Sequence, residues 1–90
     1  MKTLTEIVYK PKPEYFDQIL DDLLNDGTNC YVVVRDDEIF QFWIEDGIEE
    51  ISEAQPEALN WLDERRHMLQ KYEGNGHTKS WTGFVYKEAK

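Results

Sequence analysis

Apolar residues recur along the chain with two different periods, and together they predict two helices and four strands. Residues 14–26 hold five apolar side chains at the spacing of a single helical stripe: Phe16, Ile19, Leu20, Leu23 and Leu24. Residues 53–73 predict a second, longer helix, with Ser52 as its N-cap and Pro56 in its first turn. Four stretches rich in β-branched and aromatic residues predict strands: 3–10, 29–35, 38–45 and 78–87.

The order of these elements, β–α–β–β–α–β, is that of a ferredoxin-like domain. It predicts an α+β fold in which two helices cover one face of a four-stranded antiparallel sheet. Asp36 and Asp37 form the short link between the second and third strands, which suits a tight hairpin. Because 90 residues suffice for one domain and no linker interrupts the pattern, residues 1–90 are predicted to form a single domain.

Alternation within the strands gives the sheet two largely apolar faces. In the third strand two sets of side chains point to opposite sides, namely Phe40, Phe42 and Ile44 against Ile39, Gln41 and Trp43. The two helices can cover only one face, and monomers rarely expose several aromatic side chains together. We therefore expect a homodimer in which the second faces of two sheets pack together across a two-fold axis.

The charge balance argues against two classes of partner. The chain has 19 acidic and 10 basic residues and a net charge of −9, whereas nucleic acids and anionic membranes bind basic surfaces. No apolar run is close to the roughly 18 residues that a membrane span needs. The single cysteine, Cys30, excludes an internal disulfide and a cysteine-based zinc site. Since the first residues also lack an apolar leader-like run, a cytoplasmic location is expected.

Two stretches carry a resemblance to a known family. The opening "LTEIVYKPKPEYFDQILDDLL" and the strand end "FQFWIED" resemble the antibiotic biosynthesis monooxygenase-like proteins of the dimeric α/β-barrel superfamily. The resemblance covers nearly the whole chain and implies a ferredoxin-like protomer and a barrel dimer. Some members of that family oxidise aromatic polyketides without a cofactor, some degrade haem, and many have no assigned activity. Their catalytic asparagine and tryptophan would correspond to Asn60 and Trp61, which are adjacent here and so point in different directions on a helix.

The stretch "NWLDERRHMLQKY", residues 60–72, holds the charged residue that most needs an explanation. A spacing of 100° per residue places Arg65 in the middle of an apolar side and His67 nearly opposite, toward solvent. A guanidinium on an apolar surface keeps its charge, so it must reach water or an acceptor. Three interpretations stay open: a structural role, as a snorkelling stem or in an ion pair with a sheet or loop carboxylate such as Glu6 or Glu45, a charge that orients an anionic or enolic ligand, or a contact across the dimer.

The candidate ligand-binding residues are the aromatic and polar side chains expected near the barrel, although aromatic residues at these periods also fill ordinary cores. They are Gln41, Trp43, Trp61, Trp81 and Tyr86. Arg65 or His77, the latter in a glycine-rich turn, would polarise an oxygen atom of the ligand. The absence of a phosphate loop, a nucleophile elbow or a two-histidine motif predicts no metal and no cofactor.

Two functional hypotheses follow, and an acidic mimic of nucleic acid, which would need carboxylates at phosphate-like spacing on one surface, comes third. The first is a cofactor-independent, monooxygenase-like enzyme, an oxygenase or isomerase that acts on a small aromatic or enolisable compound. The second is a non-catalytic dimer that binds a small molecule or another protein. A cavity larger than about 300 Å³ with converging polar groups would favour the enzyme, and a filled barrel would favour the second hypothesis.

Overall fold

The computed structural model describes residues 1–46, 48–74 and 76–89, with side chains described outside 48–56. Four strands and two helices follow in the predicted order: β1 (Thr3–Tyr9), α1 (Phe16–Leu24), β2 (Tyr31–Arg35), β3 (Glu38–Glu45), α2 (Ile48–Arg65) and β4 (Thr78–Phe84). Two short 3-10 turns adjoin the helices, η1 (Pro13–Tyr15) before α1 and η2 (Arg66–Met68) after α2.

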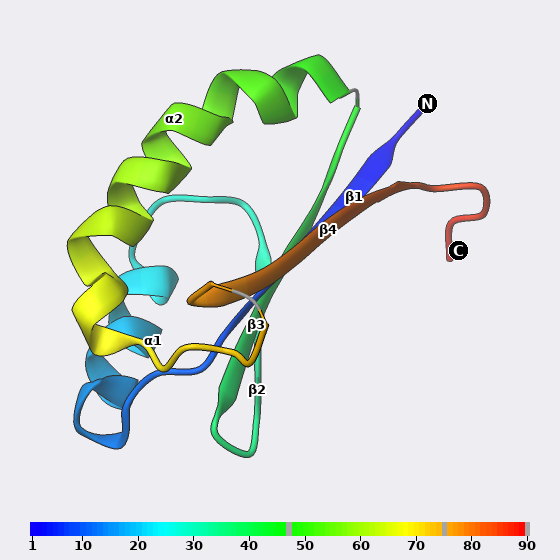
Figure 1. Cartoon of the computed structure of the whole chain (residues 1–90). Coiled ribbons are helices and arrows are strands. Elements are labelled where there is room, and N and C mark those ends of the chain that lie inside the picture. Colours follow the sequence, from blue (N-terminus) through cyan, green and yellow to red (C-terminus); the bar gives the residue numbers. More distant parts are fainter. Residues whose placement is uncertain (47, 75, 90) are drawn as a thin grey trace.

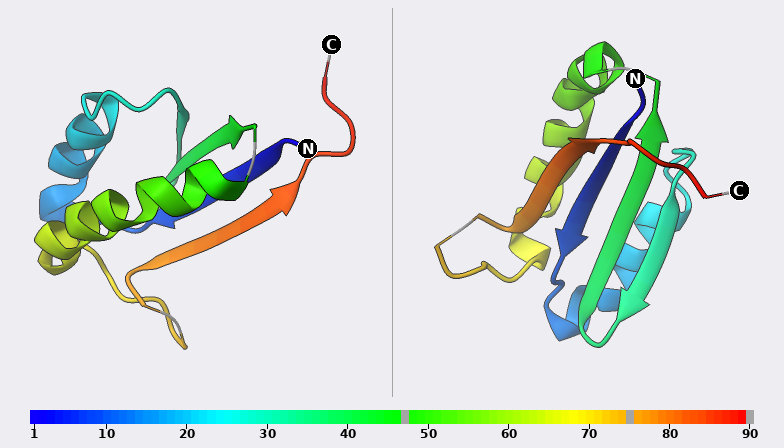
Figure 2. Two further views of the ribbon diagram at one scale, coloured as in Figure 1. Left: turned by 90° about the horizontal axis from the view of Figure 1, so that it is seen from above. Right: turned by 90° about the vertical axis from the view of Figure 1, so that its right-hand side faces the viewer.

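The four strands form one antiparallel sheet in the order β2-β3-β1-β4. Both helices lie on the same face of this sheet, as Figure 1 shows with the sheet seen edge-on. The right-hand view of Figure 2 looks onto the other face, with the helices behind the strands. The predicted α+β class is confirmed, and the arrangement is compatible with a ferredoxin-like fold.

The hairpin between β2 and β3 forms where the sequence predicts it. β3 spans Glu38–Glu45, the predicted range, and β2 spans Tyr31–Arg35. The two-residue link has a positive φ of 56° at Asp36. Aspartate tolerates this left-handed region better than most residues, which suits a tight turn between twisted strands.

The start of the second helix differs from the prediction. α2 begins at Ile48, five residues before the expected start at residue 53, so Ser52 lies inside the helix and is not its N-cap. Pro56 is likewise in the helix interior, outside the first turn. The stretch before Pro56 is rich in glutamate and contains Ala54, residues with high helix propensity, and these extend the helix toward its N-terminus.

The end of the second helix also differs from the prediction. α2 ends at Arg65, and after η2 the chain becomes extended and pairs with the segment that follows β1. Leu69 bridges to Pro11, and the backbone N–H of Gln70 donates to the carbonyl of Lys10 at 2.8 Å. These backbone hydrogen bonds stop the helix eight residues before the predicted end at residue 73.

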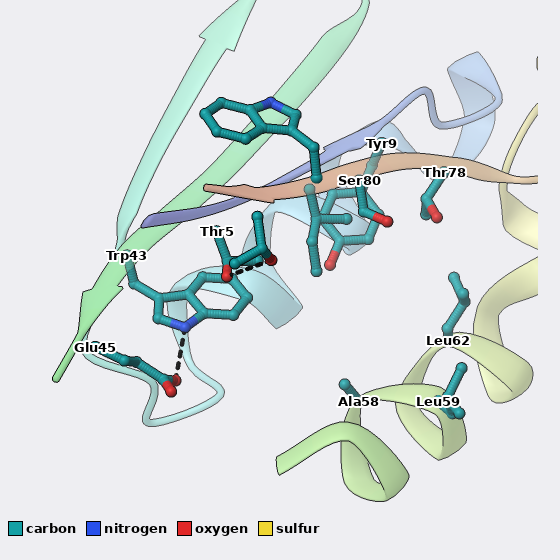
Figure 3. Close-up of a pocket in the computed structure, with 12 residues that line it drawn as sticks. Thr5, Tyr9, Trp43, Glu45, Ala58, Leu59, Leu62, Thr78 and Ser80 are labelled. Atoms are coloured by element: carbon teal, nitrogen blue, oxygen red, sulfur yellow. Dashed lines mark hydrogen bonds between the residues drawn. The ribbon is translucent and has the colours of Figure 1, made fainter. Parts of the chain in front are cut away.

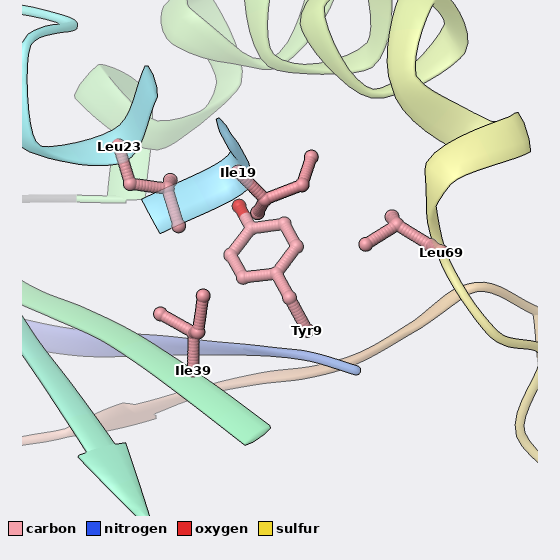
Figure 4. Packing of buried hydrophobic residues seen from close by; sticks show 5 residues of the cluster. All are labelled: Tyr9, Ile19, Leu23, Ile39 and Leu69. Carbon is pink, nitrogen blue, oxygen red and sulfur yellow. The ribbon is translucent and has the colours of Figure 1, made fainter. Parts of the chain in front are cut away.

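The main hydrophobic core lies between α1, the sheet and the segment after η2. The aromatic ring of Tyr9 sits among four aliphatic side chains in Figure 4, those of Ile19, Leu23, Ile39 and Leu69. The helical stripe predicted for α1 is therefore confirmed at its centre, with Phe16 and Leu20 partly buried beside it. Leu24 was wrongly included in that stripe, since it is 62% exposed.

Strand register assigns every strand residue to one of two faces of the sheet. The helix face is the one that packs against α1 and α2, and Tyr9 and its partner Ile39 belong to it. The open face is its opposite, and it consists of Leu4, Glu6, Val8, Tyr31, Val33, Arg35, Glu38, Phe40, Phe42, Ile44, Lys79, Trp81 and Gly83. After β4 the C-terminal segment passes on the open side of the sheet, in red in Figure 2.

Candidate functional site

Two neighbouring cavities separate α2 from the helix face of the sheet. The β4-side cavity, of about 270 Å³, lies between α2, β1 and β4. The α1-side cavity, of about 450 Å³, lies between α2, β3 and the end of α1. Five residues line both: Ile7, Tyr9, Trp43, Glu45 and Ala58. Because of these shared walls we treat the two cavities as one site, the helix–sheet cleft.

The β4-side cavity has an aliphatic wall and a polar wall. In Figure 3, Ala58, Leu59 and Leu62 of α2 lie across the cavity from the strand residues. On the strand side the hydroxyls of Thr5 and Thr82 are hydrogen-bonded to each other at 2.9 Å. One hydroxyl donates and the other accepts, so this wall keeps hydrogen-bonding capacity, and Thr78 and Ser80 also line the cavity.

The α1-side cavity has two aromatic side chains and one amide close together. The phenol of Tyr9 donates to Gln41 Oε1 at 2.9 Å, and Gln41 Nε2 lies 3.5 Å from the sulfur of Cys30. Burial raises the pKa of the Tyr9 phenol, which therefore stays a neutral donor. Trp61 from α2 meets the Tyr9 ring edge-on, with centroids 5.7 Å apart. This wall is apolar, aromatic and internally hydrogen-bonded.

Glu45 is the charged residue common to both cavities. It lies two positions after Trp43 on β3, so both side chains point to the helix face. The indole Nε1 of Trp43 donates to Glu45 Oε1 at 2.8 Å, as the dashed line in Figure 3 marks. The second carboxylate oxygen, Oε2, is shielded from solvent and has no hydrogen-bond partner among the described residues. Glu45 therefore has an oxygen that protein atoms cover and whose hydrogen-bonding capacity is unused among the described residues.

Arg65 forms an ion pair, which is one of the three interpretations of its charge. Its partner is Asp22 of α1, at 2.9 Å from Nε, so the suggested partners Glu6 and Glu45 were wrong. The guanidinium also donates to the carbonyl of Trp61 at 3.0 Å and lies 4.2 Å from the centroid of the Trp61 ring. These contacts connect the end of α2 to α1, and Arg65 is not among the described residues that line the cleft.

Arg65→Met is expected to lower the free energy of unfolding by about 1–2 kcal/mol, because it removes a charge-assisted hydrogen bond between partly buried groups. Urea denaturation at one protein concentration measures the loss. Arg66→Met is the matched control: Arg66 of η2 is more exposed and pairs with Asp63, three residues earlier in the chain, so its removal should cost less than about 0.5 kcal/mol. Equal losses at the two positions would contradict the proposed role of the Arg65–Asp22 pair.

The structure places the remaining predicted site residues differently. Trp81 of β4 is among the residues that line the β4-side cavity, but its indole Nε1 donates to Glu6 Oε1 at 3.1 Å on the open face, and the residue is 54% exposed. Tyr86 follows β4 and is 86% exposed. His77 precedes β4, is partly buried, and does not appear among the described lining residues. His67 is exposed, as its helical position predicted.

Three predicted residues, Gln41, Trp43 and Trp61, meet around the α1-side cavity. The sequence reasoning missed Tyr9 and did not place Glu45 in the cleft. Both follow from two-residue alternation, because Tyr9 lies on the helix face of β1 and Glu45 shares a face with Trp43. The alternation was therefore the signal that could have found them.

The described part of the chain gives no sign of a metal site or a membrane span. It contains no group of three histidine, cysteine, aspartate or glutamate residues placed to hold a metal ion. No helix in that part is both long and apolar enough to cross a membrane. Comparisons with protein-family models, with curated proteins and with solved structures find no match to this chain.

Proposed function

We propose that this chain is a small-molecule-binding protein, with a flat and largely apolar ligand in the helix–sheet cleft. The observation that carries the proposal is the α1-side cavity of about 450 Å³, whose walls include the rings of Tyr9, Trp43 and Trp61. Its volume lies within the usual range of ligand sites. A few polar groups at the walls, those of Gln41 and Glu45, would orient the ligand, as most small-molecule sites require.

Binding of bicyclic aromatic compounds tests this function. We expect naphthalene derivatives to shift the indole N–H resonances of Trp43 and Trp61 in two-dimensional NMR spectra of the ¹⁵N-labelled protein. Trp43→Ala should weaken binding by at least about 30-fold, close to 2 kcal/mol, because it removes the larger of the two aromatic rings that line both cavities. Tyr86→Ala is the matched control, since Tyr86 is 86% exposed and is not among the described residues that line the cleft, and it should leave the affinity within about threefold. Equal effects of the two substitutions would overturn the proposal.

A catalytic function is the second candidate, and one observation favours it. Glu45 lines both cavities, and its carboxylate could remove a proton from an enolisable ligand once the group rotates to bring the covered oxygen, Oε2, into the cleft. Removal of a carbon-bound proton would begin the oxygenase or isomerase chemistry of a monooxygenase-like enzyme. Arg65 is engaged by Asp22, and neither Arg65 nor His77 is in the described cleft lining, so the candidate catalytic group is Glu45 as a base and not a cation that polarises an oxygen of the ligand.

Proton exchange separates the catalytic candidate from simple binding. With 2-tetralone as the enolisable probe in D₂O, a catalytic cleft should accelerate exchange of the α-protons for deuterium, followed by ¹H NMR. Glu45→Gln keeps an acceptor for Trp43 but removes the base, so it should abolish the acceleration. Oxygen consumption would then distinguish an oxygenase from an isomerase. If the α-protons exchange no faster with the protein than in buffer alone, the catalytic candidate is wrong and the cleft only binds its ligand.

Pairing of two copies through the open face is also part of the proposal. Large apolar side chains remain exposed on that face, among them Tyr31, Val33, Ile44 and Trp81. Tyr31 stacks on Phe42 with ring centroids 5.1 Å apart, which gives a flat aromatic surface. Its four charged side chains are balanced, with two acidic and two basic residues: Glu6, Glu38, Arg35 and Lys79. Tyr72 of the same chain already contacts two of them, since its phenol donates to Glu38 Oε2 at 2.7 Å and its ring lies 4.5 Å from the Lys79 ammonium. A chain with a net charge of −9 can approach its own copy most easily at such a balanced face.

A cytoplasmic location completes the proposal. The one cysteine, Cys30, is a free thiol beside Gln41, which suits a reducing compartment. Fractionation of the cells that produce the protein would test the cytoplasmic location. Recovery of the protein in the secreted fraction would contradict that location.

A further inference from the structure

Glu45 shows what chemistry a ligand of the cleft should carry. A carboxylate oxygen that loses its hydration without gaining a hydrogen bond destabilises the folded protein. Glu45 Oε2 is such an atom, whereas Oε1 of the same side chain is held by Trp43 at 2.8 Å. Glu45 lines both cavities, but protein atoms cover Oε2 in this conformation, so the carboxyl group must rotate to present Oε2 to a ligand in either cavity. The group that would satisfy Oε2 is a hydrogen-bond donor on the ligand.

The charges around the cleft favour a donor that is positively charged. The α1-side cavity is lined by two further carboxylates, those of Asp26 and Glu57, which are exposed at its edge. None of the described residues that line either cavity is basic. Arg65, which packs on the cleft residue Trp61, is neutralised by Asp22. The potential in the cleft is therefore negative, and it attracts cations and repels anions.

The aromatic walls of the cleft also favour a positively charged ligand. The face of an indole or phenol ring carries partial negative charge and attracts ammonium groups, an effect that grows when water is excluded. Tyr9, Trp43 and Trp61 all contribute to the α1-side cavity. A protonated amine near Glu45 would thus be stabilised by the carboxylate and by the rings, while an aromatic body would fill the apolar space next to Ala58.

We infer that the helix–sheet cleft selects cationic amphipathic ligands, namely flat aromatic molecules that carry a protonated amine. The inference rests on the proposed function of the cleft and specifies its ligand class. In the complex the ammonium group donates a hydrogen bond to Glu45 Oε2. An anionic ligand of the same shape is rejected, because its charge would meet the carboxylates of Glu45, Asp26 and Glu57.

Three probes of matched shape test the selectivity: 2-naphthylmethylamine, 2-naphthalenemethanol and 2-naphthoate. Isothermal titration calorimetry or NMR titration at pH 7 measures their affinities for the full chain. We expect the amine to bind at least about tenfold more tightly than the alcohol, and the carboxylate to bind most weakly. Raising the salt concentration should reduce the advantage of the amine only in part, since shielded charges are screened less than exposed ones.

Glu45→Gln isolates the proposed contact. Glutamine keeps an acceptor for the Trp43 indole but places an amide donor at the position of Oε2, so the preference for the amine over the alcohol should fall to about twofold or less. Glu14→Gln is the control: it changes the net charge equally, at an exposed position outside the described cleft lining. A similar loss of preference in both variants would assign the selectivity to net charge and overturn the inference.

The outcomes also separate this inference from the function on which it rests. If all three probes bind with similar affinity, or the carboxylate binds best, and Trp43→Ala abolishes binding, the cleft binds ligands but the inference is wrong. If none of the probes shifts the resonances of Trp43 and Trp61, the proposed binding function itself is overturned, and the inference is overturned with it.

Discussion

Ile19→Ala is expected to lower the free energy of unfolding by about 3 kcal/mol. Ile19 is 0% exposed and packs between the sheet and the segment after η2, in the cluster that contains Tyr9 and Ile39. Removing three carbon atoms leaves a cavity that the neighbouring side chains fill only in part. Alanine is the best helix former, so the helix backbone is not weakened and the loss reports packing. A domain of this size has only about 5–15 kcal/mol of stability.

Leu24→Ala on the same helix is the control for this experiment. Leu24 is 62% exposed, so its truncation should change the free energy of unfolding by no more than about 0.5 kcal/mol. Urea denaturation followed by circular dichroism measures both variants, at one protein concentration because a dimer links stability to concentration. Losses of similar size at Ile19 and Leu24 would contradict the burial that the structure assigns to α1.

The first helix was predictable because its pattern is local, and the error at Leu24 has a geometric cause. Residues at i, i+4 and i+8 drift around the helix by about 40° per step, so the series Phe16, Leu20 and Leu24 reaches the edge of the buried side at its last member. A sequence pattern does not define how wide a strip the sheet covers. At the end of α1 the covered strip includes Leu23 but excludes Leu24.

The second helix was harder to predict because distant residues decide where it ends. Its apolar spacing continues through Met68, Leu69 and Tyr72, which as a local pattern predicts more helix. The competing interaction is the bridge of Leu69 to Pro11, 58 residues earlier in the chain. Contacts of this separation leave no periodic signal, so the extended segment could not be predicted from the stretch alone.

For the candidate site, the sequence predicts which residues of one strand share a face, but not which faces of different strands lie together. Alternation separates Trp43 from Phe42 correctly, but it does not say which side of β4 shares a face with Trp43. Register decides this: Thr82 pairs with Thr5, and Trp81 pairs with Glu6. Trp81 therefore lies on the open face, although it was grouped with Trp43 by residue type. Its ring covers Gly83, where an added Cβ would lie 3.2 Å from the indole.

Val33→Lys is expected to weaken self-association of the chain by at least about 100-fold, which corresponds to about 2.7 kcal/mol. Val33 lies on the open face of β2 and is 45% exposed, so the isolated chain can hold the lysine with its ammonium group in water. In a pair of copies joined through this face, each lysine would lose water among apolar side chains. Two-fold symmetry places the substitution in both copies, which doubles the cost.

Val34→Lys provides a matched control one residue away. Val34 is 46% exposed on the same strand but belongs to the helix face, where it pairs with Ile39. Light scattering across a range of concentrations should show a dimer for the unchanged chain and for Val34→Lys, and a monomer for Val33→Lys. A pair formed instead by the free edge of β2 would contact both positions, and the two variants would then dissociate alike. That result, or a monomeric unchanged chain at tens of micromolar, would overturn pairing through the open face, because only a face-to-face arrangement distinguishes two adjacent valines of equal exposure.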